Sequence, residues 1–279
     1  MPGAAHATIL GVLICALGDL LLDVIVRAEG AVAPDSEATA ETRVGAGGQS
    51  ANVAAWSAAL GADARFVGKR AADGAGELAA RELAGRGVDL LGPVVEGRNG
   101  VVVSLAAPDG TRTMFSDRGV APDLRAEELD VRWFGGCDWL HLSGYSLFRK
   151  PIDEAAAKAA GAARAQGGRI SVDLSSATGI EEYGPERLLR RLELLEPDVV
   201  FANEGELAAL RSEPPAETLV VKRGPAGFSL ADGDYPALES AIVDATGAGD
   251  ALAAGFLVGG PGLAAEAAAR CVAQLGTMP

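Results

Sequence analysis

Runs of apolar residues, separated by glycine, proline and polar clusters, divide the chain into strand-like and helix-like segments. The continuous apolar run Thr8–Leu17 ends at Gly18 and predicts a buried parallel strand. In the second half, such runs alternate with segments of helical pattern. The predicted strands are Trp139–Leu142, Arg169–Leu174, Val199–Ala202 and Thr218–Lys222, and the predicted helices are Ile152–Gln166, Glu186–Leu195 and Glu204–Leu210. This alternation predicts an α/β fold whose mostly parallel central sheet is flanked by helices.

A second group of strand-like segments has mixed polarity and predicts a smaller sheet. Val24–Arg27 and Thr39–Val44 are short candidate strands joined by a loop that contains proline and glycine. Gly100–Ala107 and Thr111–Ser116 flank Pro-Asp-Gly, which is typical of a hairpin turn. We expect these strands, from about 22–46 and 98–118, to form a small β-sheet lid inserted into a single domain that spans residues 1–279.

A glycine-rich turn late in the chain opens a predicted helix. Ser240–Val243 is predicted to be the end of a strand, Asp244–Asp250 is the turn, and Ala251–Val258 is the helix. Unpaired backbone N–H groups and the helix dipole point at one spot there, which suits an anion such as a phosphoryl group. Gly247 and Gly249 lack a Cβ atom, so a ligand can approach the backbone closely.

Asp250 is out of place in a turn that binds an anion, because its carboxylate repels a phosphate. It is explained as the acceptor of a proton from a hydroxyl group that attacks the phosphate. The alternative is that Asp250 only caps the helix and that the glycines only make a tight turn.

An earlier glycine turn opens a second predicted helix. Gly47 and Gly48 precede Asn52, and the Ala-rich segment Val53–Leu60 continues the helix. Asp23 lies five residues after Gly18, beyond the carboxyl end of the first strand, where ligands bind in open α/β sheets.

Charge and cysteine usage narrow the class of protein. The net charge is −14 and the isoelectric point is about 4.6, which argues against nucleic acid or an anionic membrane as a partner. An anionic ligand must therefore be held locally. The apolar run Ile9–Val26 contains Asp19 and Asp23 and makes a poor membrane span. The three cysteines show no metal-binding spacing, so we expect a reducing, cytoplasmic location.

Four sequence blocks in order carry a resemblance to a known family. They are Gly47–Glu77 (GGQSANVAAWSAALGADARFVGKRAADGAGE), Phe201–Glu206 (FANEGE), Val220–Leu230 (VVKRGPAGFSL) and Val243–Phe256 (VDATGAGDALAAGF). Over nearly its whole length the chain resembles the ribokinase-like (PfkB-type) carbohydrate kinases. The resemblance implies a three-layer sandwich with a β lid, and transfer of the γ-phosphoryl group of Mg·ATP to a hydroxyl group of a small sugar or sugar acid.

The resemblance also implies a role for each matching residue. Asp250 occupies the position of the catalytic base, and Gly247, Ala248 and Gly249 occupy that of the anion hole. Asn203 and Glu206 would organise Mg²⁺, and the alternative is that these two residues only cap a helix. The implied sugar-binding residues are Asp23, Gly47, Gly48, Asn52 and Arg112, and the implied nucleotide-binding residues are Asn203, Lys222, Gly224, Gly227 and Thr246. A monovalent cation such as K⁺ and a homodimer formed through the lid are further implications.

Several alternatives stay open at this point. Lys222 is either a nucleotide-binding residue or a solvated lysine at a strand end. Arg112 and Arg118 flank a lid strand and either reach the substrate or belong to a solvated face. Gln49-Ser50 replaces the Lys-Gly of ribokinases proper, which puts ribose in doubt as the substrate. A nucleoside kinase of the same fold and a non-catalytic sugar- or nucleotide-sensing protein are the rival functions. A dinucleotide-binding dehydrogenase is disfavoured, because the glycines lack the Gly-x-Gly-x-x-Gly order.

Overall fold

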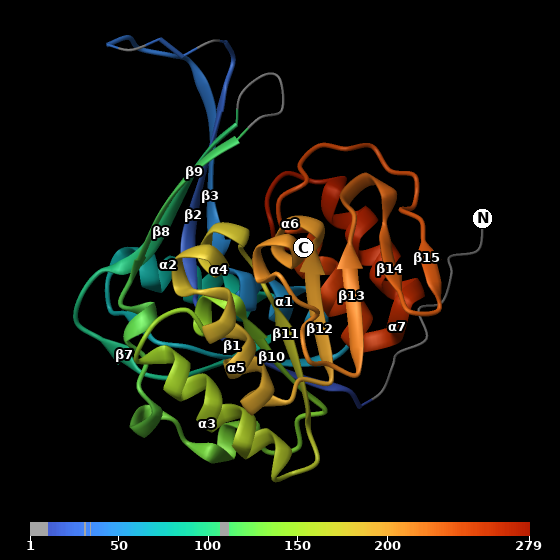
Figure 1. Cartoon of the computed structure of the whole chain (residues 1–279). Coiled ribbons are helices and arrows are strands. Elements are labelled where there is room, and N and C mark those ends of the chain that lie inside the picture. Colours follow the sequence, from blue (N-terminus) through green and yellow to red (C-terminus); the bar gives the residue numbers. More distant parts are fainter. Residues whose placement is uncertain (1–10, 31, 34, 107–111) are drawn as a thin grey trace.

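The computed structural model describes residues 11–30, 32–33, 35–106 and 112–279, and its centre is one large sheet (Figure 1). The strands of this sheet are β1 (Leu13–Leu17), β4 (Asp63–Val67), β6 (Val88–Leu91), β10 (Trp139–Ser143), β11 (Arg169–Asp173), β12 (Val199–Asn203), β13 (Thr218–Lys222), β14 (Phe228–Leu230) and β15 (Gly233–Tyr235). They are ordered β15-β14-β13-β12-β11-β10-β1-β4-β6. All neighbours from β13 to β6 pair in parallel, whereas β14 and β15 are antiparallel. The mostly parallel sheet is thus confirmed.

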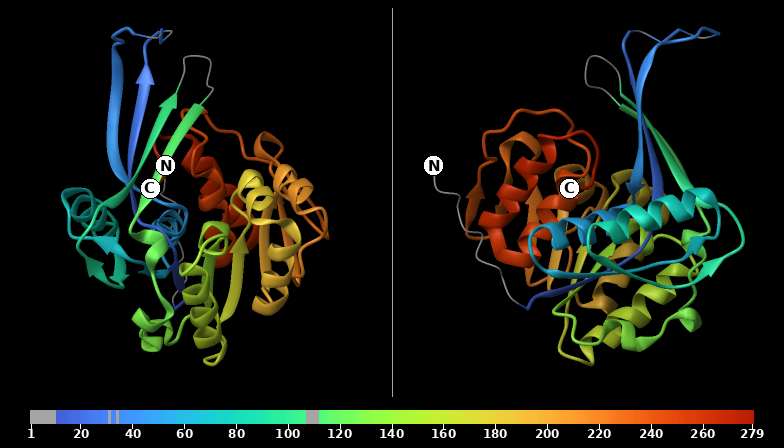
Figure 2. Two further views of the ribbon diagram at one scale, coloured as in Figure 1. Left: turned by 60° about the vertical axis from the view of Figure 1, so that its left-hand side comes forward. Right: turned by 180° about the vertical axis from the view of Figure 1, so that it is seen from behind.

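Helices cover both faces of this sheet and complete a three-layer sandwich (Figures 1 and 2). One face carries α1 (Gln49–Ala59), α2 (Gly74–Gly85) and α7 (Ala248–Val272), and the other carries α3 (Ile152–Arg164), α4 (Ala177–Tyr183), α5 (Pro185–Leu195) and α6 (Glu204–Leu210). Alternate residues of the buried strands face the two layers. Ile14 packs toward α1 and α7, while Cys15 packs in the cluster that contains α3 and α5. Two short strands, β5 (Arg70–Ala71) and β7 (Val94–Val95), pair only with each other and do not join this sheet.

A separate four-stranded sheet rises from the core as the lid (Figure 1). Its strands are β2 (Leu21–Ala28), β3 (Ala40–Gly47), β8 (Asn99–Ala106) and β9 (Arg112–Gly119), in the order β3-β2-β8-β9. The predicted lid is confirmed, although the tip of the 98–118 hairpin lies outside the described residues. Only residues 18–20 separate β1 from β2, and Gly48 alone separates β3 from α1.

The carboxyl ends of the parallel strands bring polar residues to one edge of the sheet. Asp173 ends β11, Asn203 ends β12 and Lys222 ends β13. The helices α1, α6 and α7 begin at the same edge, so their unpaired N–H groups face it as well. The edge therefore collects the residues that the sequence singles out.

The predicted strand at Ser240–Val243 is wrong, because this segment joins no sheet. Its Val243 N–H group instead donates to the carbonyl oxygen of Val272, at the end of α7, over 2.8 Å. Ile242 is 71% exposed. The apolar run thus lies along a helix end rather than in the core, and apolar character alone does not separate these two cases.

The helix after the glycine turn is longer than predicted. α7 extends to Val272 and is broken by non-helical backbone at Gly259 and Gly260, just before Pro261. In the described part of the chain, it is the one helix that satisfies the length and hydropathy of a membrane span, with a mean hydropathy of 1.4 over its most apolar window. Half of that window is buried inside the protein, where the helix packs against α1.

Candidate active site

The turn before α7 depends on a glycine at its last position. Gly247 has φ of 81°, and a Cβ atom there would come within 2.9 Å of the Cα atom of Thr277. Any other residue would be strained and would collide with the neighbouring backbone. The Asp244 carboxylate fixes the same turn by accepting N–H bonds from Thr246 (2.7 Å) and Gly276 (3.2 Å). The sequence therefore folds into a rigid start for the helix that carries Asp250.

Asp250 lies in the first turn of α7 and is 9% exposed. Its Oδ2 atom accepts a hydrogen bond of 2.7 Å from the Asn52 side chain, which comes from the first turn of α1. Burial raises the pKa of Asp250 to about 7, the Asn52 hydrogen bond lowers it, and the nearby Asp173 carboxylate raises it further. A carboxylate with a pKa near neutrality can accept a proton at physiological pH and release it again.

The two predicted glycine turns converge on this acid. Gly48 has φ of 103°, and a Cβ atom there would lie 2.3 Å from the Asp19 carbonyl oxygen. A Cβ atom on Gly47 would lie 2.1 Å from the Asp23 carboxylate. The absence of both Cβ atoms lets the β3–α1 junction pack directly against the segment that carries Asp23. The sequence-predicted residues Asp23, Gly47, Gly48, Asn52 and Asp250 are thereby brought together.

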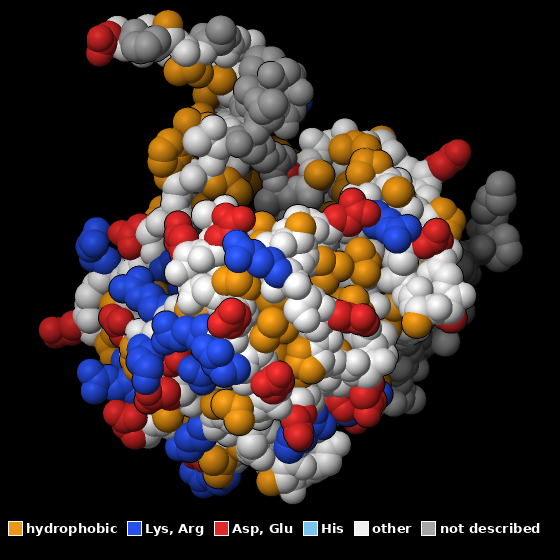
Figure 3. Space-filling model, in the orientation of Figure 1, with side chains coloured by type: hydrophobic (Ala, Val, Ile, Leu, Met, Phe, Trp, Pro, Cys, Tyr) orange, Lys and Arg blue, Asp and Glu red, His pale blue; other side chains and the backbone are white. Residues whose placement is uncertain are grey.

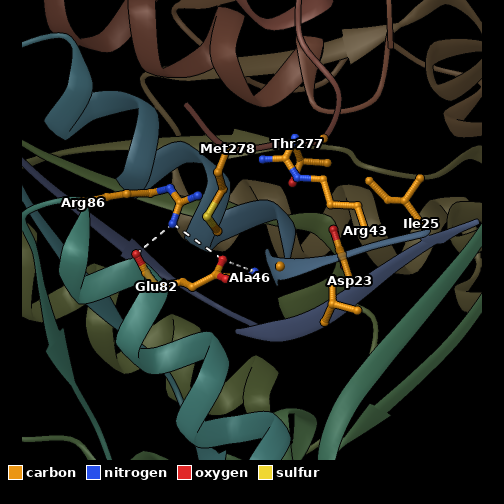
Figure 4. Close-up of a pocket in the computed structure, with 11 residues that line it drawn as sticks. Asp23, Ile25, Arg43, Ala46, Glu82, Arg86, Thr277 and Met278 are labelled. Atoms are coloured by element: carbon orange, nitrogen blue, oxygen red, sulfur yellow. Dashed lines mark hydrogen bonds and ion pairs between the residues drawn. The ribbon is translucent and has the colours of Figure 1, made fainter. Parts of the chain in front are cut away.

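Asp23 projects from β2 into a cavity of about 140 Å³ next to the lid (Figure 4). Burial raises the pKa of Asp23 to about 6, and the neighbouring Thr277 hydroxyl group partly opposes this. Thr277 also donates a hydrogen bond of 3.0 Å to the Asn52 oxygen, so it lies between Asp23 and the Asn52–Asp250 pair. The cavity thus begins one side chain away from the candidate base.

Lys222 lies beside the start of α7 with its side chain only 14% exposed, so it is not the solvated lysine of the alternative prediction. Its Nζ atom lies 2.6 Å from Asp173 and 3.8 Å from Glu206. Burial lowers the pKa of Lys222, but both carboxylates outweigh burial and raise this pKa above its ordinary value. A Cβ atom added to Gly249 would lie 3.6 Å from Nζ, so the ammonium group faces the first turn of α7. A cation at this point favours a phosphoryl group.

Asp173 is a functional candidate that the sequence reasoning missed. It is fully buried, and its second oxygen accepts the Ser175 N–H group over 2.8 Å. The signal that could have found it is its position as an acid at the carboxyl end of a buried strand. Gln49 stands out in the sequence only as a departure from ribokinases. It accepts a hydrogen bond from the Ser175 hydroxyl group, and a further hydrogen bond from Gln49 lowers the pKa of Asp250.

Asn203 and Glu206 form a reciprocal capping box at the start of α6. The Asn203 side chain accepts the Glu206 N–H group, and the Glu206 carboxylate accepts the Asn203 N–H group, each over 2.8 Å. Burial raises the pKa of Glu206. Asn203 and Glu206 therefore do cap the helix, as the alternative prediction states. The cap uses only one of the two carboxylate oxygens of Glu206.

Two carboxylates at this edge of the sheet, Asp173 and Glu206, are candidates for binding Mg²⁺ together with a nucleotide. No group of three or more His, Cys, Asp or Glu side chains able to hold a metal is found within the described ranges. Glu206 and Asp173 both approach Lys222, so two carboxylates face the same spot. Mg²⁺ usually binds proteins through one or two carboxylates, several waters and substrate phosphates. The donor set fits an ion that arrives with a nucleotide rather than a resident metal.

The remaining predicted residues occupy the surrounding loops. Gly224 and Gly227 have φ of 55° and 92° and make the turn from β13 to β14, directly after Lys222. Thr246 lies in the turn before α7. The side chain of Arg112 lies outside the described part of the structure, so its prediction stays a prediction. Arg118 is engaged elsewhere, because its guanidinium group pairs with Asp19 and donates to Asp19 Oδ1 over 2.9 Å.

Comparison with known proteins is consistent with this geometry. The family model described as pfkB family carbohydrate kinase matches residues 12–276. An ATP-dependent ribose-1-phosphate kinase from Halopiger xanaduensis is 34% identical over 255 residues, covering 86% of this chain and 82% of the relative. A fructokinase from Escherichia coli is 29% identical over 265 residues, covering 87% of this chain and 82% of the relative.

Solved structures show the same fold. A candidate ribokinase II from Escherichia coli, in complex with ATP and Mg²⁺, superimposes with a TM-score of 0.80 at 24% identity. The superposition covers 96% of this chain and 94% of that protein. The lid, the parallel sheet and the helical layers are therefore shared features of the two chains.

Proposed function

The chain belongs to the pfkB family of carbohydrate kinases, and on this premise we propose that it transfers the γ-phosphoryl group of Mg·ATP to a hydroxyl group of a small sugar or sugar acid, with Asp250 as the general base. The observation that carries the proposal is the surroundings of Asp250. This buried carboxylate has a pKa of about 7 and lies in a helix turn that suits phosphate, close to the Lys222 ammonium group.

Each side chain at the acceptor end has a distinct task. Asp23 and Asn52 bind hydroxyl groups of the acceptor as hydrogen-bond partners and hold the reacting hydroxyl group against Asp250. Asp250 accepts the proton as the oxygen attacks phosphorus, which is typically worth about 10²- to 10⁴-fold in rate. The N–H groups of Gly247, Ala248 and Gly249, together with Lys222, stabilise the charge on the phosphoryl group.

The nucleotide is held on the other side of Asp250. Gly224, Gly227 and Thr246 flank Lys222 and the start of α7, where the polyphosphate chain would lie. Mg²⁺, when bound, neutralises phosphate charge, and Asn203 and Glu206 are the residues that would hold its hydration shell, with Asp173 beside them. Binding of a monovalent cation rests on the family resemblance alone.

The names of the relatives indicate two acceptor classes, a sugar phosphate and a free ketose. A nucleoside is a third class, because nucleoside kinases share the fold. Phe115 is the one aromatic residue in the described lid strands, and its side chain is 57% exposed, which gives a base little to stack on. We therefore favour a sugar or sugar derivative without a base.

A coupled ATP-to-ADP assay tests the proposal with ribose, ribose 1-phosphate, fructose, 2-keto-3-deoxygluconate and adenosine as acceptors. Asp250→Asn should reduce kcat by about 10²- to 10⁴-fold. Asp89→Asn is the matched control, because the Asp89 side chain is 76% exposed and belongs to β6. Undiminished turnover in Asp250→Asn rules out its role. Tight ATP binding without turnover of any acceptor favours a sensing protein.

A homodimer through the lid is the oligomeric state that we propose. The lid exposes large apolar side chains (Figure 3). Val44, Leu105 and Phe115 share one face of the lid, and Met114 lies on the other face. An exposed apolar face of this kind is typical of an interaction surface. Light scattering of the purified protein should give twice the chain mass, and Phe115→Lys should shift it toward the monomer. A monomeric wild-type protein at micromolar concentration contradicts the dimer.

The free cysteines also support a reducing, cytoplasmic location.

A further inference from the structure

We propose that the acceptor carries an anionic group, a phosphate or a carboxylate, and that Arg43 in the lid binds it. This inference rests on the proposed kinase function and names the substrate class of the same site. Arg43 lies in β3 opposite Ile25 and lines the cavity that also contains Asp23 (Figure 4).

Most charged groups around this cavity already have partners. The Glu82 carboxylate accepts the Ala46 N–H group over 2.9 Å and lies 3.7 Å from Arg86. Arg86 donates further to the carbonyl oxygens of Glu82 and Pro279. Glu82 and Arg86 thus hold α2, β3 and the C-terminal segment together. The charged groups left to meet a ligand are Asp23 and Arg43.

Arg43 has spare hydrogen-bonding capacity. Its guanidinium group donates to the Leu275 carbonyl oxygen, and within the described ranges no carboxylate forms an ion pair with it. An arginine has five N–H donors, so most of them are free for a ligand. Their planar fork matches a carboxylate or a phosphate through two parallel hydrogen bonds. Asp23, by contrast, suits the hydroxyl groups of a sugar and disfavours an anion.

The position of Arg43 relative to Asp250 supports a site in which Asp23 binds hydroxyl groups and Arg43 binds the anionic group. Thr277 lines the cavity with Arg43 and donates to Asn52, which in turn donates to Asp250. The cavity thus lies two hydrogen bonds from Asp250, and on our inference an acceptor held at Asp250 and Asp23 places its anionic group at Arg43. The chain has a net charge of −14, so an anionic acceptor needs a local cation, and Arg43 supplies it.

The test compares neutral and anionic acceptors on wild-type protein, Arg43→Gln and Arg43→Lys. Comparison of ribose 1-phosphate with ribose shows whether the site prefers a phosphate group on the acceptor. Comparison of 2-keto-3-deoxygluconate with fructose shows whether it prefers a carboxylate group. In the wild type we expect kcat/KM to favour one anionic acceptor at least about tenfold. Arg43→Gln should raise KM for that acceptor by about 10- to 100-fold, with KM for ATP unchanged, and Arg43→Lys should recover part of the loss.

Arg27→Gln is the matched control, because Arg27 is an exposed arginine on the neighbouring strand β2 and does not line the cavity. It removes the same charge from the lid and should change KM less than about twofold. A wild type that prefers neutral acceptors, or an Arg43→Gln that impairs neutral and anionic acceptors equally, overturns the inference.

Failure of the kinase proposal is distinguishable from failure of this inference. If no acceptor is phosphorylated, the proposed activity is wrong. Calorimetric titration of the wild type and Arg43→Gln with ribose 1-phosphate and 2-keto-3-deoxygluconate then still decides whether Arg43 binds an anion. Equal affinity in both proteins overturns its role, and weaker binding by the variant supports it. Arg43→Lys keeps the test valid if Arg43→Gln does not fold.

Discussion

The Asn52 side chain donates a hydrogen bond of 2.7 Å to the Asp250 carboxylate, although the two residues are 198 positions apart in the chain. This contact joins the first turns of α1 and α7. It also opposes the effect of burial on the acid, because a donor to the carboxylate favours the ionised form. The protonation of Asp250 is therefore set by two distant parts of the chain together.

The activity of the wild type should depend on the ionisation of Asp250. Because its pKa in the free protein is raised to about 7, kcat/KM should fall as the pH drops below neutrality, by about tenfold for each pH unit well below the midpoint. Measurement of kcat/KM from about pH 5.5 to about pH 9 checks this. A profile that is flat down to about pH 5 would show that another group accepts the proton.

Asn52→Ala should move that midpoint to higher pH. Loss of its hydrogen bond removes a contribution that lowers the pKa of Asp250, while the burial that raises this pKa remains. We expect an upward shift of about 0.5–1 pH unit, together with a higher KM for the acceptor. An unchanged midpoint would mean that the contact is absent in solution. Gln166→Ala serves as a control for nonspecific effects, because Gln166 is exposed just after α3 and its side chain donates to the Ala162 carbonyl oxygen.

Asp250→Asn should stabilise the fold at alkaline pH. The pKa of Asp250 rises from an ordinary value near 4 to about 7 on folding, so the folded protein binds more protons than the unfolded chain between these values. Stability therefore falls as the pH rises from about 4 to about 7. At about pH 8 the variant should gain about 1–3 kcal/mol in free energy of unfolding, and at about pH 4 it should gain almost nothing. Denaturant titrations at both pH values measure this. A loss at the alkaline pH would contradict a buried, costly carboxylate.

Two glycines of the same turn should respond differently to alanine. At Gly249 an added methyl group would make ordinary contacts at 3.6 Å with Lys222, and Gly249→Ala should fold as the wild type does. It would still narrow the phosphate-binding turn, so we expect kcat to fall by about 10- to 100-fold. At Gly247 the positive φ and the collision with Thr277 should cost about 1–3 kcal/mol of stability in addition. Thermal melts beside kinetics separate the two effects, and full activity in Gly249→Ala would contradict the anion hole.

Removal of the buried ammonium group should damage both stability and nucleotide binding. Lys222→Met leaves Asp173 and Glu206 close together and uncompensated, which typically costs about 3–5 kcal/mol. KM for ATP should rise as well, because a phosphate contact is lost. Lys150→Met is the control, since Lys150 forms an exposed pair with Glu154 that is worth less than about 1 kcal/mol. Similar melting temperatures for the two variants would contradict the buried cluster.

Periodicity and turn signals were sufficient to predict the mostly parallel sheet flanked by helices and the lid. These features follow from local signals, since apolar runs become buried strands and a glycine turn opens a helix. The prediction that Asp23, Asn52 and Asp250 share one site came instead from the resemblance to the kinase family. The strand predicted at Ser240–Val243 failed because an apolar run gives no information about its partner. That partner proved to be the end of α7, as the bond from Val243 to Val272 shows.

The site residues that were missed depend on contacts between distant parts of the chain. Asp173 acquires its significance only when β11 and β13 bring it to Lys222, 49 residues later. Gln49 is visible in the sequence, but nothing local indicates that it meets Ser175. The capping box of Asn203 and Glu206 has a local signature, and that signature cannot distinguish a helix cap from a metal-binding position.

The short junction between β3 and α1 links two tasks mechanically. One residue, Gly48, separates the strand that carries Arg43 from the helix that carries Asn52. A strand and a helix joined so closely cannot tilt independently, so a displacement of the lid is transmitted to the hydrogen bond on Asp250. Occupancy of the sugar side therefore acts, through the backbone, on the hydrogen bond that lowers the pKa of Asp250.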